Sequence, residues 1–185
     1  FNIAYAAVDR HASGARANHV ALHWLGRFGG QRSFTYAELA SQSSRCANAL
    51  KALGLGKGDC VFILAARIPE LYIAALGALK IGAVVSPLFS AFGPEPIATR
   101  LNLGHGKALI TTQSLYQRKV QQVRESLTSI EHVLLIGDDG QRTDVALGLE
   151  TQMQTLERQR LVTANVQRRV DELNVRAPVD GVIGT

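Results

Sequence analysis

The chain has 185 residues, of which 46% are hydrophobic and 19% are charged. This length suits one compact domain, or one domain with an appendage, and the composition excludes a wholly disordered chain. No stretch reaches the roughly 18 uncharged apolar residues of a membrane-spanning helix. The net charge of +5 is scattered along the chain rather than clustered, so we expect no nucleic-acid partner.

The two cysteines, Cys46 and Cys60, cannot form a disulfide framework, and the sequence has no CxxC motif. We therefore expect two inert core thiols in a reducing compartment, and we predict a cytoplasmic location. Residue 1 is Phe rather than Met, and no basic and apolar leader follows it, so the true start is expected upstream.

The composition of the chain changes near residue 144. All 11 aromatic residues and 14 of the 17 glycines precede that point. This shift predicts two structural units, one over residues 1–147 and one over residues 148–185.

Helices and strands alternate along the first unit. A capping box, with Thr35 as N-cap and Glu38 three residues later, marks the start of the longest helix, and Gly54 marks its end. In chain order we expect a helix over 2–11, strands over 20–25 and 33–36, a helix over 36–53, a strand over 60–65, a helix over 70–81, a strand over 83–86, a helix over 94–103, a strand over 108–111, a helix over 114–127 and a strand over 132–136.

Strands separated by helices of this length predict an α/β fold with a partial, mostly parallel sheet flanked by helices. Ligands of such sheets gather beyond the carboxyl ends of the strands, so the loops after Ala65, Ser86 and Thr111 are the candidate positions. The Gly56-Lys57-Gly58-Asp59 segment lacks the spacing of a phosphate loop and is interpreted as a turn before a strand. The five histidines show no metal-ligand spacing, so no metal site is predicted.

Several short segments of the first unit carry information together, through their order and spacing. They are Phe1-Asn2-Ile3-Ala4, Phe34-Thr35-Tyr36-Ala37-Glu38-Leu39, Gly54-Leu55-Gly56-Lys57-Gly58-Asp59, Ile68-Pro69-Glu70-Leu71, Leu79-Lys80-Ile81-Gly82-Ala83-Val84 and Pro87-Leu88-Phe89-Ser90-Ala91-Phe92-Gly93-Pro94-Glu95. Together they resemble the N-terminal region of AMP-forming acyl-CoA synthetases, in particular acetate–CoA ligases, over about residues 1–147.

The resemblance implies a two-step reaction. ATP and a carboxylate such as acetate form an acyl-adenylate and pyrophosphate, and the thiol of CoA then attacks the activated carbonyl. The full-length enzyme would use ATP, Mg²⁺ and CoA. The phosphate loop, the acidic Mg²⁺ ligand and the C-terminal lysine of the family have no counterpart in this chain, so we assign no catalytic residue and expect the chain alone to be inactive.

The resemblance also implies CoA-binding positions. The segment Phe89-Ser90-Ala91-Phe92 corresponds to the one beside the pantetheine tunnel in relatives, which makes Phe89, Ser90 and Ala91 candidate CoA-binding residues. A plain strand-to-helix connection is the alternative. Arg118 and Lys119 lie near the arginines that bind the CoA nucleotide phosphates in relatives, and an exposed helix face is the alternative there.

The tail resembles another family. A helix is expected over Leu149 to Leu173, with a heptad pattern that could support a coiled-coil partner. This helix and the following segment from Arg176 to Gly184 resemble periplasmic membrane fusion proteins, the adaptors of secretion and efflux systems, with a half lipoyl-like strand segment at the end. A natural fusion and an artificial junction near residues 143–150 both remain open. The alternatives to an acetate–CoA ligase are therefore a periplasmic adaptor or another adenylate-forming ligase.

Overall fold

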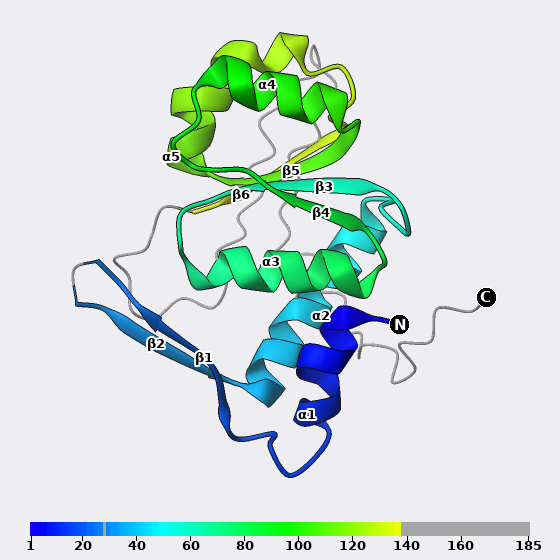
Figure 1. Cartoon of the computed structure of the whole chain (residues 1–185), viewed down its shortest axis with the longest axis vertical. Coiled ribbons are helices and arrows are strands. Elements are labelled where there is room, and N and C mark those ends of the chain that lie inside the picture. The colour runs from blue at the N-terminus through cyan, green and yellow to red at the C-terminus, as the bar shows by residue number, and fades with distance from the viewer. Residues whose placement is uncertain (28, 138–185) are drawn as a thin grey trace.

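A parallel sheet lies at the centre of the fold, with helices on both of its faces (Figure 1). The computed structural model describes residues 1–27 and 29–137. The strands of this sheet are β3 (Cys60–Leu64), β4 (Val84–Pro87), β5 (Gly106–Thr112) and β6 (His132–Ile136), in the spatial order β4-β3-β5-β6. The expected α/β class with a partial, mostly parallel sheet is confirmed.

The helices divide between the two faces of the sheet. They are η1 (Tyr5–Asp9), α1 (Arg10–Ala12), α2 (Tyr36–Ala52), α3 (Pro69–Lys80), α4 (Pro94–Leu103), α5 (Gln113–Leu115), η2 (Tyr116–Val120) and η3 (Gln121–Ser126). Helices α2 and α3 share one hydrophobic core with the sheet, and α4 shares the other core with the segment from α5 to η3 (Figure 1).

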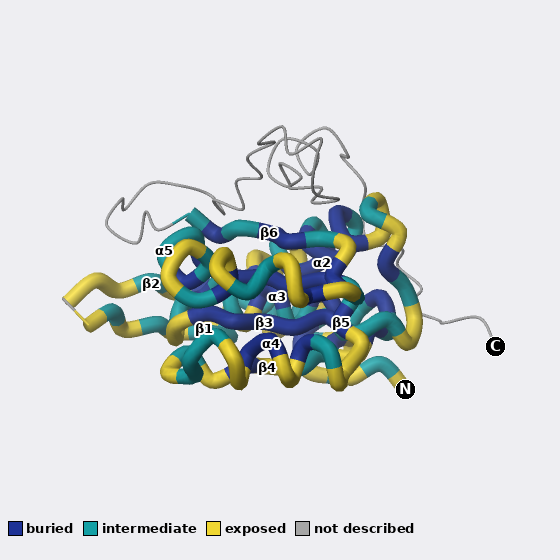
Figure 2. The backbone as a smooth tube through the Cα atoms, turned by 90° about the horizontal axis from the view of Figure 1, so that it is seen from above, coloured by how far each residue is buried: buried dark blue, intermediate teal, exposed yellow. Residues whose placement is uncertain are grey.

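Alternation along the strands creates these two cores. In β3, Val61 and Ile63 face the core of α2 and α3, whereas Phe62 and Leu64 face the core of α4. Successive side chains of a strand point to opposite faces, so a strand covered on both sides is apolar throughout. Figure 2 accordingly shows β3 as a buried tube through the middle of the molecule.

The structure contains the capping features that the sequence predicts at the ends of α2 and α3. The Thr35 side chain accepts a hydrogen bond from the Glu38 backbone, and the Glu38 carboxylate accepts one from the Thr35 N–H at 2.8 Å, which completes the capping box of α2. Pro69 occupies the first turn of α3, where its missing N–H costs no helical hydrogen bond. Gly54, after α2, has the positive φ of 79° expected of a helix-terminating glycine.

Two features differ from the expected elements. The strands β1 (Val20–Leu25) and β2 (Gln31–Thr35) pair antiparallel as a separate hairpin, outside the parallel sheet. The single helix expected over 114–127 is divided into α5, η2 and η3, which differ in the number of residues per turn. In η2, Lys119 bonds to the backbone of Ser90 and Phe92, 29 and 27 residues away, and no local sequence pattern encodes those contacts.

The second predicted unit, residues 148–185, lies outside the described residues, and so does the helix expected over 149–173. Among the helices within residues 1–27 and 29–137, none combines the length and apolar character needed to cross a membrane.

Candidate functional site at the carboxyl edge of the sheet

The carboxyl ends of the parallel strands lie along one edge of the sheet. Because β4, β3, β5 and β6 all run in the same direction, the loops that follow them start from this edge. The loops after Ala65, Ser86 and Thr111, which the sequence marks as ligand positions, are therefore neighbours.

The loop of residues 88–93, between β4 and α4, is the part of this edge that carries most of the predicted site residues. It begins from a fixed point, since buried Leu88 donates its N–H to the Ile63 carbonyl at 2.8 Å and so extends the pairing of β4 with β3. The Phe92 N–H then closes a turn on the Phe89 carbonyl at 3.0 Å. Phe89 remains 63% exposed, so its ring is accessible at this edge of the sheet.

An aromatic pair and a cation stabilise the far end of the loop. The Phe89 and Phe92 rings meet edge to face, with 5.6 Å between their centroids. The Arg100 guanidinium, from the next turns of α4, lies 4.2 Å from the Phe92 ring centroid. Contacts of this geometry are favourable because the cation meets the negative face of the ring.

Lys119 joins the 88–93 loop to η2. Its ammonium donates to the Ser90 carbonyl at 2.6 Å and to the Phe92 carbonyl at 2.8 Å. The structure thus brings together residues that the sequence assigns to one site but that lie 27 and 29 positions apart.

Arg118, the neighbour of Lys119 in η2, makes no such bond to the loop in the described part of the chain. Its side chain is exposed, and its Nε donates to the Ser114 carbonyl at 3.1 Å, within its own helical segment. Ser114 in turn follows Thr112, whose hydroxyl accepts the Leu115 N–H at 3.4 Å and caps α5. A guanidinium at the surface of this edge is available to an anionic group brought by a ligand.

Sequence reasoning missed Arg100. It placed Phe92 in the segment beside the pantetheine tunnel but did not include it among the candidate CoA-binding residues. The stacking of Arg100 on Phe92 had no sequence signal, because it depends on how α4 leaves the loop.

The Gly56–Asp59 turn is structural. It precedes the amino end of β3, at the opposite edge of the sheet from the 88–93 loop. The Asp59 carboxylate accepts the Gly56 N–H at 2.8 Å and pairs with Lys107 at 3.1 Å. The Gly56 hydrogen bond first, and the Lys107 contact after it, lower the pKa of Asp59.

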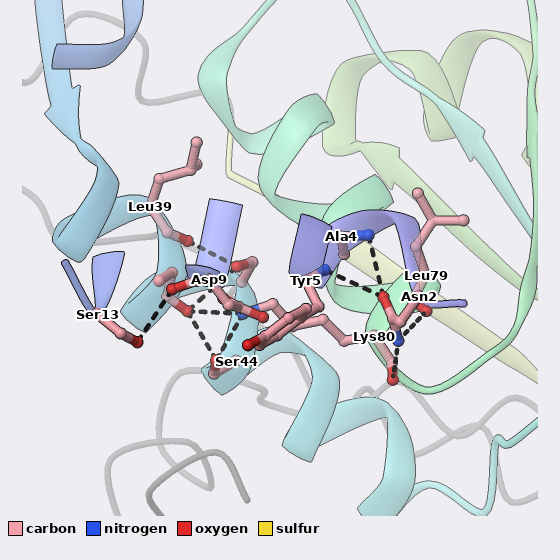
Figure 3. A network of polar contacts seen from close by, with 11 residues as sticks. Asn2, Ala4, Tyr5, Asp9, Ser13, Leu39, Ser44, Leu79 and Lys80 are labelled. Carbon is pink, nitrogen blue, oxygen red and sulfur yellow. Dashed lines mark hydrogen bonds and ion pairs between the residues drawn. The ribbon is translucent and has the colours of Figure 1, made fainter. Parts of the chain in front are cut away.

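A second polar cluster ties the N-terminal segment to the core (Figure 3). Lys80, at the end of α3, donates to Asp9 at 2.6 Å, to the Ser44 hydroxyl at 2.8 Å and to the Ala40 carbonyl at 3.1 Å. Asn2 binds the Leu79 and Lys80 carbonyls through its amide nitrogen. These partners satisfy the ammonium internally, so the cluster is a structural junction.

Within residues 1–27 and 29–137, no three His, Cys, Asp or Glu side chains are grouped so that they could hold a metal ion. The 88–93 loop presents an exposed aromatic ring, with small neighbours at Ser90 and Ala91 and with the cations of Arg100 and Lys119 close to its backbone or rings.

Comparison with known proteins gives the family. The model of the AMP-binding enzyme family matches residues 8–172, a range that includes residues 149–172 of the tail. The acetyl-coenzyme A synthetase of Streptomyces coelicolor is 39% identical over 153 residues, which is 78% of this chain and 23% of that protein. The Bacillus subtilis acetyl-coenzyme A synthetase is 38% identical over 141 residues, which is 76% of this chain and 24% of that protein.

Solved structures agree with the sequence relatives. The Brucella canis acyl-CoA synthetase superposes with a TM-score of 0.67 at 30% identity, covering 80% of this chain and 26% of that one. The anthranilate CoA ligase AuaEII in complex with anthranoyl-AMP gives a TM-score of 0.65 at 26% identity, covering 74% of this chain and 25% of that one. The chain thus spans about a quarter of the length of these relatives. Because the family model matches most of its residues, the chain belongs to the AMP-binding enzymes, and its described part has the N-terminal α/β fold of the AMP-forming acyl-CoA synthetases.

Proposed function

We propose that this chain supplies the N-terminal part of an ATP-dependent acetate–CoA ligase. The carboxylate oxygen attacks the α-phosphorus of ATP and pyrophosphate leaves, which gives acetyl-AMP. The CoA sulfur then attacks the acetyl carbonyl carbon, AMP leaves, and the thiol proton is released. The observation that carries the proposal is the 38–39% identity to acetyl-coenzyme A synthetases over three quarters of the chain, a span that includes the 88–93 loop.

The carboxyl edge of the sheet is the CoA side of this proposed reaction. Phe89, Ser90 and Ala91 would flank the pantetheine arm, because the aromatic ring is exposed and the small residues let the backbone approach the ligand closely. Arg118 would supply positive charge to the nucleotide phosphates from the exposed surface of η2, and Lys119 belongs to the same site through its bonds to the loop.

ATP and Mg²⁺ would bind to the remaining three quarters of the proposed enzyme, since this chain spans only about a quarter of its relatives' length. The 185-residue chain by itself should therefore form no acyl-adenylate. A cytoplasmic location is part of the same proposal and accords with two unpaired cysteines.

The second candidate function is an adenylate-forming ligase that acts on another carboxylate, so the preferred carboxylate distinguishes it from an acetate–CoA ligase. The solved anthranilate CoA ligase supports another adenylate-forming ligase of the same fold as the alternative. Since the proposed site concerns CoA and not the carboxylate, acetate, propionate, benzoate and anthranilate should be compared as substrates.

Two half-reactions test the proposal. The isolated chain should give no acetate-dependent ATP–pyrophosphate exchange above a no-protein control. A chimera that carries this chain in place of the matched quarter of the Bacillus subtilis acetyl-coenzyme A synthetase should give both exchange and acetyl-CoA. Exchange by the isolated chain would contradict the proposal that ATP binds outside this chain. A folded chimera without carboxylate-dependent exchange would contradict the proposal that the chain is part of a ligase.

A variant of Phe89 tests the proposed CoA site separately from adenylate formation. In the chimera, Phe89→Ala should raise KM for CoA about tenfold and leave the exchange rate unchanged, because exchange needs no CoA. Tyr72→Ala is the matched control, since Tyr72 is also an exposed aromatic residue but lies on α3, outside the proposed site. An equal loss in both half-reactions would contradict the assignment of Phe89.

A further inference from the structure

Lys119 makes contacts that a phosphate-binding lysine would not make. Its ammonium has three N–H donors, and two of them are committed to the Ser90 and Phe92 carbonyls at 2.6 and 2.8 Å. Those distances are typical of charge-assisted hydrogen bonds. The side chain is also half-buried, unlike that of its neighbour Arg118.

The 88–93 loop needs such a donor. The Ser90 and Phe92 carbonyls both approach the same nitrogen atom, so their partial negative charges converge. Carbonyl oxygens held in this way need a hydrogen-bond donor, because a backbone acceptor without a partner is costly away from water. The loop itself contributes only one internal turn, the Phe92 N–H to Phe89 carbonyl bond.

From this geometry we propose that Lys119 is a positioning residue, which acts on CoA by holding the 88–93 loop and not by pairing with the CoA phosphates. The inference rests on the CoA assignment under the proposed function and deepens it. The start of the loop is fixed by the hydrogen bond from Leu88 to β3. Lys119 holds the carbonyls of Ser90 and Phe92, and Arg100 stacks on the Phe92 ring. These anchors together keep Phe89 exposed at the carboxyl edge.

The first test follows the loop in the complete 185-residue chain by amide hydrogen exchange. Lys119→Met should speed exchange of the Phe92 amide about tenfold, because this amide donates the loop's internal hydrogen bond. The Leu88 amide should keep its rate, because it is bonded to β3 and not to the loop. Lys51→Met is the matched control, since Lys51 is an exposed lysine at the end of α2, and it should change nothing in the loop.

Rescue shows whether the ammonium itself is responsible. Lys119→Cys treated with 2-bromoethylamine acquires an aminoethyl thioether of nearly the length of lysine, and it should recover slow exchange in the loop. Treated wild-type chain and treated Lys51→Cys control for reaction at Cys46 and Cys60. Unchanged exchange in Lys119→Met, or no recovery after alkylation, would overturn the proposal.

The second test asks which part of CoA senses Lys119. CoA and pantetheine, which lacks the nucleotide and its phosphates, are titrated into the chain while the loop amides are followed by NMR. Lys119→Met should weaken the response to both ligands by a similar factor of about ten. A loss confined to CoA would overturn the proposal, because it would mean direct phosphate pairing.

The outcomes of the two tests are separable. If neither ligand perturbs the wild-type loop, the CoA assignment of the proposed function fails, and with it the role of Lys119 toward CoA. The exchange experiment would in that case still decide whether Lys119 holds the loop.

Discussion

At the scale of single residues, Lys80 carries a charge into the junction of three helices. Its side chain is only 9% exposed, and its partners come from η1 and α2 (Figure 3). Burial lowers the pKa of Lys80, and the hydrogen bond and charge of Asp9 oppose that shift. A buried cation is tolerated here because all three of its donors have acceptors.

Removing one member of this junction should be costly. Lys80→Met leaves the Asp9 carboxylate and the Ser44 hydroxyl without their cationic partner, and we expect the free energy of unfolding to fall by about 2 kcal/mol. That value is below the range for fully buried pairs, since Asp9 keeps a quarter of its exposure. Urea denaturation measures the change, with Lys51→Met as the control. Equal stability of the two variants would contradict the role of the junction.

Cys46 is a buried thiol next to the same junction. Burial raises its pKa to about 12, and the nearby positive charge of Lys80 opposes that shift. In the unfolded chain the thiol has a pKa of about 9, so above pH 9 the unfolded state loses protons that the folded state keeps. The stability that depends on the neutral thiol is complete below pH 9 and is lost as the pH rises toward 12.

This difference predicts a pH dependence. Cys46→Ala should destabilise the chain by about 1 kcal/mol at pH 7 through lost packing. The wild type should then lose about 2 kcal/mol relative to the variant between pH 8 and pH 10.5, so that the two stabilities converge or cross. Cys60→Ala is the control, because Cys60 is less buried and burial raises its pKa less. A constant difference between wild type and Cys46→Ala over this range would refute the prediction.

At the scale of elements, α2 and α3 pack closely because a glycine lies where they meet. A Cβ atom at Gly77 would lie 2.8 Å from both Cβ and Sγ of Cys46 and 3.0 Å from the Ser43 carbonyl. These distances are too short for an alanine without movement of the α2 backbone. The small size of residue 77 therefore sets how closely the two helices approach each other.

An alanine at this position should destabilise the fold despite its better helix propensity. Overpacking typically costs 1–3 kcal/mol, and replacing a helical glycine returns up to about 1 kcal/mol. We expect Gly77→Ala to lower the free energy of unfolding by about 1–2 kcal/mol, measured by urea denaturation. Gly56→Ala is the control, because no atom lies within 4 Å of the added Cβ, and it should stay within about 0.5 kcal/mol of wild type. Stabilisation by Gly77→Ala would contradict the packing argument.

At the scale of the whole molecule, the hairpin of β1 and β2 joins the core through buried Phe34, whereas two polar contacts hold its outer part. The Trp24 indole donates to the Arg67 carbonyl at 2.6 Å, and Arg32 pairs with Glu70 at 2.7 Å. Both partners follow β3 in the chain, and Figure 1 shows the hairpin projecting from the sheet domain. A two-stranded hairpin has little stability of its own and depends on such docking.

The hairpin should therefore loosen before the parallel sheet unfolds. Trp24 is the only tryptophan of the chain, so its fluorescence reports the hairpin alone. In urea, the fluorescence midpoint should fall below the midpoint from far-UV circular dichroism, and Glu70→Gln should widen that gap. Glu95→Gln, at the matching first turn of α4, should leave the gap unchanged. Coincident midpoints in wild type and Glu70→Gln would show that the hairpin unfolds with the rest.

The sequence by itself determined the elements and the family. The short apolar runs of β3 and β5, the capping box at Thr35 and the glycine at position 54 are local signals. Each predicts its structure because it depends on neighbours within a few residues. The ordered short segments likewise indicated the acyl-CoA synthetase family without any fold.

Only the tertiary structure decided the contacts of the candidate site. The family resemblance places Lys119 near the CoA phosphates, with an exposed helix face as the alternative, and only the structure shows its ammonium bonded to the backbone of a loop 27 to 29 residues away. The same applies to Arg100 over Phe92 and to the divided helix after Gln113. Hydrogen bonds and stacking between distant segments depend on how strands and helices are placed around the sheet, and no local pattern of residue types encodes that placement.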